Sequence, residues 1–240
     1  MESNYRAIMD HVYFHEGGFV NNPKDPGGAT NMGITQAVYN SYRNNKGLTV
    51  KGVRGITREE ADDIYRLRYW NKIDGGELPS GVDYITMDSA VNSGIHQSAL
   101  WLQRAINRLS TGTIKEDGEI GPTTIRMARQ CDPAKLIDTI CEMRLSFLQV
   151  IRHRTTKALL WPTFGGGWTN RIKGYKNKAG VRKGGVQAWS HALRLGTKEP
   201  EVIRPHLPPD IQGKKPISPA VVLVAIVIAV LIVIWRTVHG

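Results

Sequence analysis

The chain has 240 residues, enough for one large domain or two small ones, and 41% of them are hydrophobic. A charged fraction of 22% and a count of two cysteines exclude a disordered chain, a collagen and a disulfide-rich secreted domain. The net charge is +11, from 32 Lys and Arg against 21 Asp and Glu, so an anionic partner is expected. Nucleic acid, an anionic membrane and an acidic polymer all meet that condition.

Helical patterns dominate the first 180 residues, and no strong strand alternation is visible. The fold class expected is therefore mainly α. In chain order, helices are predicted over residues 3–15 with Ser3 as the cap, 58–73 after a capping box at Thr57 and Glu60, 80–93, 96–109, from Pro122, 133–159, and from Trp168. The segment between Gly17 and Thr35 is rich in Asn, Pro and Gly, which favours a short hairpin or an irregular lobe.

The two cysteines are not expected to pair. Cys131 and Cys141 are ten residues apart in a segment with a helical pattern, which separates them by about 15 Å of helical rise. That distance is too long for a disulfide, so both are interpreted as reduced thiols in the core.

The residues with the clearest chemical interest lie near the end of the first predicted helix. Gly17 and Gly18 end that helix, so Glu16 falls in its last turn, where the negative end of the helix dipole disfavours an ionised carboxyl group. A carboxyl group that keeps its proton is what a general acid needs. By position alone, a solvated surface glutamate remains the alternative.

A second carboxylate follows in the run from Asn22 to Thr35. Asp25 begins an Asp-Pro-Gly-Gly sequence, which is also a turn signature in which aspartate caps the turn. If that turn faces Glu16, the two carboxyl groups form the pair that glycosidic bond cleavage uses. Thr30 is either a loop hydroxyl or, beside such a pair, a group that orients water.

These residues carry a family resemblance. Glu16-Gly17-Gly18-Phe19, the run from Asp25 to Asn31 and Gly33-Ile34-Thr35 resemble glycoside hydrolase family 108, which contains N-acetylmuramidases of bacteria and phages. The resemblance implies that Glu16 is the general acid, that Asp25 is a general base or electrostatic partner, and that Thr30 assists. It further implies substrate-binding roles for four residues: Phe19, Asn31, Asp88 and Asn92.

A second motif resembles a predicted peptidoglycan-binding module. It comprises Leu-Gln-Arg-Ala at residues 102–105, Asp-Gly-Glu-Ile-Gly-Pro at 117–122, and a closing element with Phe164, Trp168 and Arg171. Residues 102, 106, 120 and 125 are apolar and are expected in the core. The two resemblances together cover about residues 5–178. They imply a lysozyme-like catalytic lobe over 1–95 and a helical wall-binding lobe over 96–178.

The C-terminal quarter of the chain is different. Between residues 171 and 215 there are eleven Lys and Arg and three acids, so +8 of the net charge lies there, among many Gly and Pro. Residues 179–216 are therefore interpreted as a basic linker that, with the rest of 171–215, attracts anionic lipid. Nucleic acid is not the expected partner, because no DNA- or RNA-binding motif accompanies the charge.

Residues 217–236 are predicted to form a transmembrane helix. No charge occurs between Lys215 and Arg236, and twenty residues at 1.5 Å each span about 30 Å, the thickness of a bilayer. Residues 1–20 lack the apolar region of a secretory signal peptide. The expected location is thus a membrane, with the inner membrane favoured, through a single C-terminal anchor.

The orientation stays open. Basic residues precede the predicted helix, so the positive-inside rule places the enzyme body in the cytoplasm, away from a wall substrate. A phage or prophage endolysin held inside until lysis would resolve this conflict, as would a host enzyme that inserts the other way.

The sequence therefore predicts a monomeric peptidoglycan hydrolase that cleaves the β-1,4 bond between N-acetylmuramic acid and N-acetylglucosamine, without a cofactor. No metal site is expected, since His11 and His15 lack a third ligand. Two alternatives stay open: a lytic transglycosylase, which needs one acid, and an inactive peptidoglycan-binding membrane protein.

Overall fold

The computed structural model describes residues 1–21, 28–153, 155–177 and 179–197, and in these ranges the chain is mainly helical. The α-helices are α1 (Tyr5–Glu16), α2 (Gln36–Asn45), α3 (Arg58–Arg68), α4 (Val82–Ser93), α5 (Ile95–Leu109), α6 (Pro122–Gln130), α7 (Pro133–Val150), α8 (Trp161–Lys173) and α9 (Val186–Leu195). Short 3₁₀ helices are η1 (Glu2–Asn4), η2 (Val53–Gly55), η3 (Trp70–Ile73) and η4 (Gly75–Glu77). Two hairpins pair β1 (Thr30–Asn31) with β2 (Ile34–Thr35), and β3 (Tyr175–Lys176) with β4 (Arg182–Lys183).

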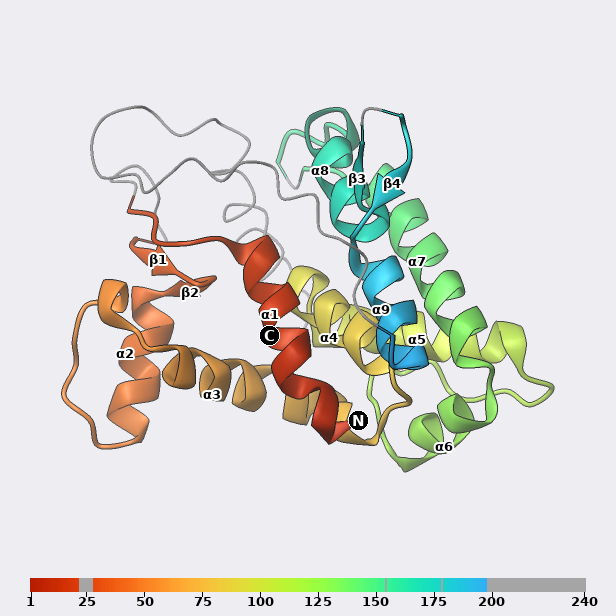
Figure 1. Cartoon of the computed structure of the whole chain (residues 1–240), viewed down its shortest axis with the longest axis horizontal. Coiled ribbons are helices and arrows are strands. Elements are labelled where there is room, and N and C mark those ends of the chain that lie inside the picture. The colour runs from red at the N-terminus through yellow and green to blue at the C-terminus, as the bar shows by residue number, and fades with distance from the viewer. Residues whose placement is uncertain (22–27, 154, 178, 198–240) are drawn as a thin grey trace.

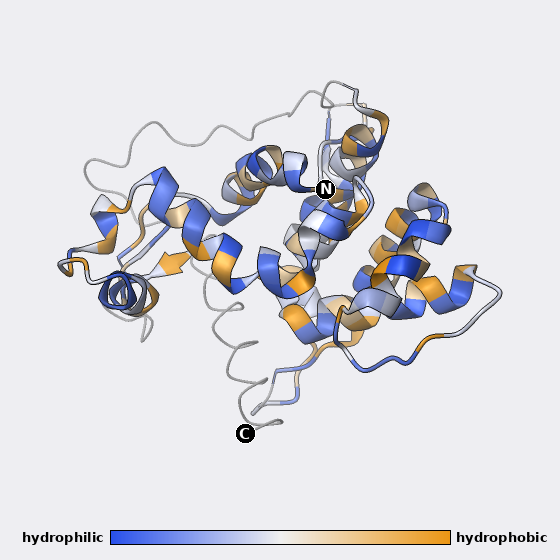
Figure 2. Ribbon diagram, turned by 90° about the horizontal axis from the view of Figure 1, so that it is seen from below, coloured by the Kyte–Doolittle hydropathy of each residue, from blue (hydrophilic) through white to orange (hydrophobic). Residues whose placement is uncertain are grey.

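Helix α1 lies between two groups of elements (Figure 1). On one side are the β1–β2 hairpin, α2 and α3, and on the other are α4 to α9. Most helices carry both hydrophobic and hydrophilic residues along their length (Figure 2), as expected for helices with one face in a core. Helix α4 differs from the others in burial, because every residue from Val82 to Asn92 is buried. It is the central helix and packs against α5, α7 and α9.

The hydrophobic core is continuous across the expected boundary between residues 95 and 96. Gly94 forms the break between α4 and α5, as predicted. Buried residues from both sides of that break, such as Met87 and Leu102, nevertheless belong to one cluster. The two expected lobes therefore share a core in the described structure.

Local sequence signals place several helix starts correctly. The capping box at Thr57 is present, with the Thr57 hydroxyl accepting from the Glu60 backbone N–H and the Glu60 carboxylate accepting from that of Thr57. Pro122 begins α6. Ser3 as the cap of α1 is wrong, because Asn4 occupies that position and Ser3 lies in η1.

Two helix boundaries near the end of the chain differ from prediction. The helix that begins at Pro133 ends at Val150 instead of Leu159, and α8 begins at Trp161 instead of Trp168. Three glycines at 165–167 argue against a helix by propensity. The side chain of Trp161 lies directly over Gly165, one turn further on, where any Cβ would overlap its ring. Packing of an indole ring thus outweighs the low helix propensity of glycine.

The expected linker over residues 179–216 is wrong for its first part. Residues 186–195 form α9, with Val186 and Trp189 buried against α4, α7 and α8. The Trp189 ring stacks on the His11 ring of α1 at a centroid distance of 4.1 Å. The average composition of 171–215 concealed this ten-residue amphipathic segment.

Some predictions concern residues outside the described ranges. They are Asp25, the remainder of the linker after residue 197, and the membrane helix predicted over 217–236. Within the described ranges, none of the helices combines the length and hydrophobicity that a membrane crossing requires. Cys131 and Cys141 are both free thiols.

Candidate active site

Glu16 occupies the last turn of α1, as predicted. The N–H of Gly17 donates to the carbonyl of Tyr13, and Gly17 has a φ of +77°, a left-handed value that favours glycine. The chain therefore turns away immediately after Glu16. The Glu16 side chain is only 2% exposed, so its carboxyl group lies in an environment with little water.

Arg171 connects Glu16 to a second buried acid. Nη1 of Arg171 in α8 donates to Oε1 of Glu16 at 3.0 Å. Its Nε and Nη2 donate to Oδ1 of Asp88 in α4, at 3.0 and 2.8 Å. Oδ2 of Asp88 accepts from Nη2 of Arg144 in α7 at 2.8 Å. We call Glu16, Arg171, Asp88 and Arg144 the buried charge cluster.

The cluster draws on four helices that are distant in sequence. Arg171 is 155 residues from Glu16 and 83 from Asp88. Asp88 and Arg144 have no exposed side-chain surface. Two acids and two arginines leave no net charge when Glu16 is ionised, and a net charge of +1 when it is protonated.

The surroundings act differently on the two acids. Burial raises the pKa of Glu16, the negative charge of Asp88 raises it further, and Arg171 opposes both without reversing the shift. Burial would raise the pKa of Asp88 as well, but Arg171 and Arg144 hold it well below its usual range. Asp88 therefore stays ionised, and Glu16 is the member of the cluster that gains and loses a proton most readily.

The turn of the β1–β2 hairpin lies close to the other oxygen of Glu16. Met32 and Gly33 form its two-residue turn, both with positive φ, the geometry that suits a tight hairpin. A Cβ on Gly33 would lie 3.0 Å from Oε2 of Glu16 and would overlap the hydroxyl of Tyr65. That hydroxyl donates to the carbonyl of Met32 at 3.0 Å, which fastens the turn to α3. Only glycine lets the hairpin approach Glu16 so closely.

The other sequence-predicted residues occupy varied positions around this hairpin. Thr30 is in β1, where its backbone pairs with Val20 in both directions. Asn31 is buried, and its amide donates to the carbonyls of Val53 and Arg54. That contact fixes the hairpin to η2 and leaves Asn31 little surface for a ligand.

Phe19 lies under the side chain of Arg54, whose guanidinium carbon is 4.5 Å from the ring centroid. This is a cation–π contact at the edge of the hairpin region. The aromatic ring is packed against the core and is half-buried.

The structure revises the expectation for Asp88, whereas substrate binding by Asn92 stays a prediction. Both are buried in α4, and both oxygens of Asp88 accept hydrogen bonds from arginines. Asp88 thus has no surface with which to touch a sugar. Its contacts place it behind Glu16 as a partner of Arg171. Arg171 itself is buried too, so it is not among the basic residues of 171–215 that are free to meet lipid.

Sequence reasoning missed three residues that shape the environment of Glu16: Arg144, Tyr65 and Gly33 as a close neighbour of its carboxylate. Arg171 was noted only as part of a module motif and as the first of the basic residues of 171–215. The available signal in the sequence was the Gly167-Trp168 pair with Arg171 three residues further on, but nothing in the linear chain says that Glu16 is the partner of Arg171.

His11 and His15 do not form part of a metal centre in the residues described, where no group of three His, Cys, Asp or Glu side chains is placed to hold an ion. Both rings pack against Trp189 of α9. Burial, and the positive charge of Arg171, lower the pKa of His15 to about 3, so this ring is neutral.

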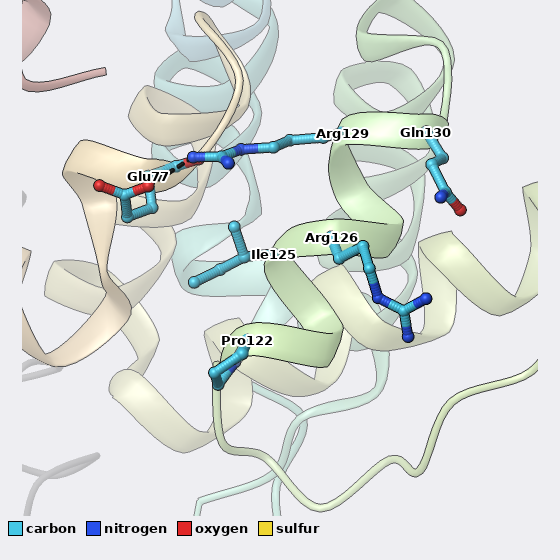
Figure 3. Close-up of a pocket in the computed structure, with 6 residues that line it drawn as sticks. All are labelled: Glu77, Pro122, Ile125, Arg126, Arg129 and Gln130. Carbon is cyan, nitrogen blue, oxygen red and sulfur yellow. Dashed lines mark hydrogen bonds and ion pairs between the residues drawn. The ribbon is translucent and has the colours of Figure 1, made fainter.

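A shallow pocket lies elsewhere, between η4 and α6 (Figure 3). Glu77 and Arg129 form an ion pair across it, while the Arg126 side chain points away from Glu77. Apart from these residues it is lined by Pro122, Ile125 and Gln130. No member of the buried charge cluster lines it, and none of its residues has the burial expected of a catalytic carboxyl group.

A helical body in which a buried glutamate ends the first helix, next to a tight hairpin, is consistent with a glycoside hydrolase. Comparisons with known proteins support that class. A family model described as glycosyl hydrolase 108 matches residues 9–94, and one described as a predicted peptidoglycan domain matches residues 97–173. No match was found among curated proteins.

One solved structure, described as SagA of Brucella abortus, is 34% identical to this chain. The match covers 81% of this chain and 97% of that one, with a TM-score of 0.60. The chain is a peptidoglycan hydrolase, a glycoside hydrolase joined to a peptidoglycan-binding domain. It belongs to the glycosyl hydrolase 108 family.

Proposed function

We propose that this protein is an N-acetylmuramidase, which hydrolyses the β-1,4 bond between N-acetylmuramic acid and N-acetylglucosamine. Glu16 is the general acid that protonates the oxygen of the leaving sugar. The observation that carries this role is the burial of the Glu16 carboxyl group, at 2% exposure, at the C-terminal end of α1. Burial favours the protonated acid at neutral pH, where an exposed glutamate is ionised.

The two oxygens of Glu16 have different surroundings. Oε1 accepts a hydrogen bond from Arg171, which fixes the direction of the carboxyl group, while Oε2 lies near the hairpin turn at Gly33. Because Arg171 engages Oε1, we assign to Oε2 the proton that is transferred to the glycosidic oxygen. As the bond to the leaving sugar breaks, Glu16 becomes ionised, and Arg171 stabilises the charge that appears.

Asp25 is proposed as the second carboxylate, which activates water or stabilises the positive charge on the sugar ring, with Thr30 helping to orient the water. This assignment rests on the motif, because Asp25 lies outside the described residues. Thr30 belongs to the strand that leads into the turn beside Glu16, so its place in the fold is compatible with that role.

The first test is Glu16→Gln in the full chain, assayed by clearing of purified peptidoglycan. We expect activity to fall by about 10²–10⁴-fold or more, the usual contribution of a general acid. Asp10→Asn is the matched control, since Asp10 is an exposed carboxylate on the same helix. Retained clearing by Glu16→Gln, with helical content unchanged, would contradict the assignment.

Product analysis separates the proposed hydrolase from the transglycosylase alternative. A muramidase releases reducing sugar ends, whereas a lytic transglycosylase releases 1,6-anhydro sugars, and mass spectrometry distinguishes them. If the chain is a hydrolase, Asp25→Asn should strongly reduce its activity. If it is a transglycosylase, Asp25→Asn should leave its activity unchanged. Absence of any product from the unaltered chain would favour the inactive binding protein.

We also propose that residues 217–236 anchor the enzyme in a membrane, as in an endolysin of a phage or prophage. The support is the uncharged apolar stretch in the sequence. Carbonate extraction of membranes tests the anchor, because an inserted helix resists it. Protease protection in intact spheroplasts then reports the side on which the enzyme body lies.

A further inference from the structure

Arg171 lies in the region matched by the peptidoglycan-domain model, yet its guanidinium reaches the glutamate of the glycosyl hydrolase region. Three of its nitrogens are used, one on Glu16 and two on Asp88. A side chain that is 8% exposed and contacts two acids from two other helices is held at both ends. This contact pattern needs the planar, forked guanidinium of arginine.

We propose that Arg171 is a positioning residue that holds the Glu16 carboxyl group in its donating geometry and sets the pH range over which Glu16 can give up a proton. The proposal deepens the function above and rests on Glu16 being the general acid. It makes the peptidoglycan-binding region part of the catalytic unit, because α8 supplies the group that orients the acid.

Asp88 and Arg144 act behind Arg171. Asp88 accepts from two nitrogens of Arg171 and thereby fixes the plane of its guanidinium, leaving Nη1 directed at Glu16. Arg144 pairs with the remaining Asp88 oxygen and balances its charge. Without Asp88, the full charge of Arg171 would act on Glu16 and favour its ionised, inactive form.

Among Glu16 and the titratable groups that surround it, Glu16 is the one whose titration is expected to shape the pH profile of activity. His15, next to it on α1, is neutral because burial and Arg171 lower its pKa to about 3. Tyr65 and Tyr69 face Glu16 from α3 and its C-terminal end, and burial together with the Glu16 charge raises the pKa of both above the ordinary tyrosine value. The fall in activity at high pH, which we call the basic limb of the pH profile, is therefore assigned to the loss of the proton from Glu16.

The test compares pH profiles of kcat and KM on soluble peptidoglycan fragments for the full chain and three variants. Arg171→Met removes the positive charge beside Glu16, so we expect the basic limb to move to higher pH and kcat at the optimum to fall by about 10²-fold through lost orientation. Arg171→Lys keeps the charge and loses the fork, so its limb should stay near that of the unaltered chain while kcat remains reduced. KM should change little in both.

Arg144→Met is the matched control for structural damage. It removes the other arginine on Asp88 but no contact to Glu16. We expect thermal destabilisation similar to that of Arg171→Met, with a much smaller shift of the basic limb. Equal shifts in the two variants, or no shift in Arg171→Met, would overturn the proposal. If Arg171→Met fails to fold, equal kcat in Arg171→Lys and the unaltered chain overturns it.

An NMR titration of the Glu16 carboxyl carbon, assigned by its loss in Glu16→Gln, separates this proposal from the proposed function. A titration that moves up in pH in Arg171→Met supports the effect of Arg171 on Glu16 even if the chain proves inactive on peptidoglycan. An active chain whose Glu16 titration is unaffected by Arg171→Met would leave the function standing and refute the positioning role.

Discussion

Two groups of ion pairs in this molecule use the same residue types at similar distances but differ in burial. The buried charge cluster joins α1, α4, α7 and α8, and its members are almost fully covered. The second group lies on α1, at the C-terminal end of α2 and on α3, and is partly exposed. We call it the surface ion pairs, and its members are Lys46–Asp63, and Arg58 with Asp10 and Asp62.

The difference in burial determines how much free energy each charged group costs the folded protein. Taking an ion out of water carries a penalty that its partner must offset, so removing one member of a buried cluster leaves a buried charge without its partner. An exposed pair gives about 0–1 kcal/mol because water screens it. The buried charge cluster is thus sensitive to each of its members, and it contains the proposed general acid, Glu16.

The largest effect is expected for Asp88→Ala, which leaves two arginines buried with only Glu16 to balance them. We expect a loss of about 3–5 kcal/mol in the free energy of unfolding at pH 7, measured by urea denaturation. The pKa of Asp88 is held below its usual range in the folded state, so its stabilisation is present above the unfolded pKa near 4 and is lost as the pH falls through the folded value. The difference in the free energy of unfolding between the unaltered chain and Asp88→Ala should therefore become smaller in strong acid. A difference below about 1 kcal/mol at pH 7 would show that the cluster is no more sensitive than a surface pair.

An intermediate effect is expected for Gly33→Ala. Its positive φ costs about 1–2 kcal/mol with a side chain, and the new methyl group would press on Tyr65 and Glu16. We expect activity to fall about tenfold or more, through displacement of the hairpin from Glu16. Gly47→Ala is the matched control, because Gly47 also has a positive φ but open space around it. If both variants lose stability equally and both keep full activity, the close approach of the hairpin has no catalytic consequence.

The smallest effect is expected for Arg58→Met among the surface ion pairs. Arg58 is 37% exposed and contacts Asp10, which is 62% exposed. We expect a loss of under about 1 kcal/mol in the free energy of unfolding, reduced further at high salt by screening. Thermal melts in low and high salt measure it. A loss as large as that of Asp88→Ala would remove the distinction between the two groups.

Much of the local structure was predictable because its causes are local. The capping box at Thr57, the start of α6 at Pro122 and the break at Gly94 depend on a few adjacent residues. The position of Glu16 at the end of α1 follows from the glycines after it in the same way. The start of α8 and the existence of α9 were not predicted, because they depend on Trp161 over Gly165 and on Trp189 against α1.

The sequence by itself determined the class of the molecule: a mainly helical chain with the motif of a glycosyl hydrolase and a glutamate at the end of its first helix. These properties need only short-range patterns and residue identity. The tertiary structure decided what surrounds that glutamate. It buried Glu16, brought Arg171 to it from 155 residues away, and turned Asp88 from an expected sugar contact into the partner of that arginine. The physical reason is that burial and the pairing of distant charges arise only when the four helices pack together.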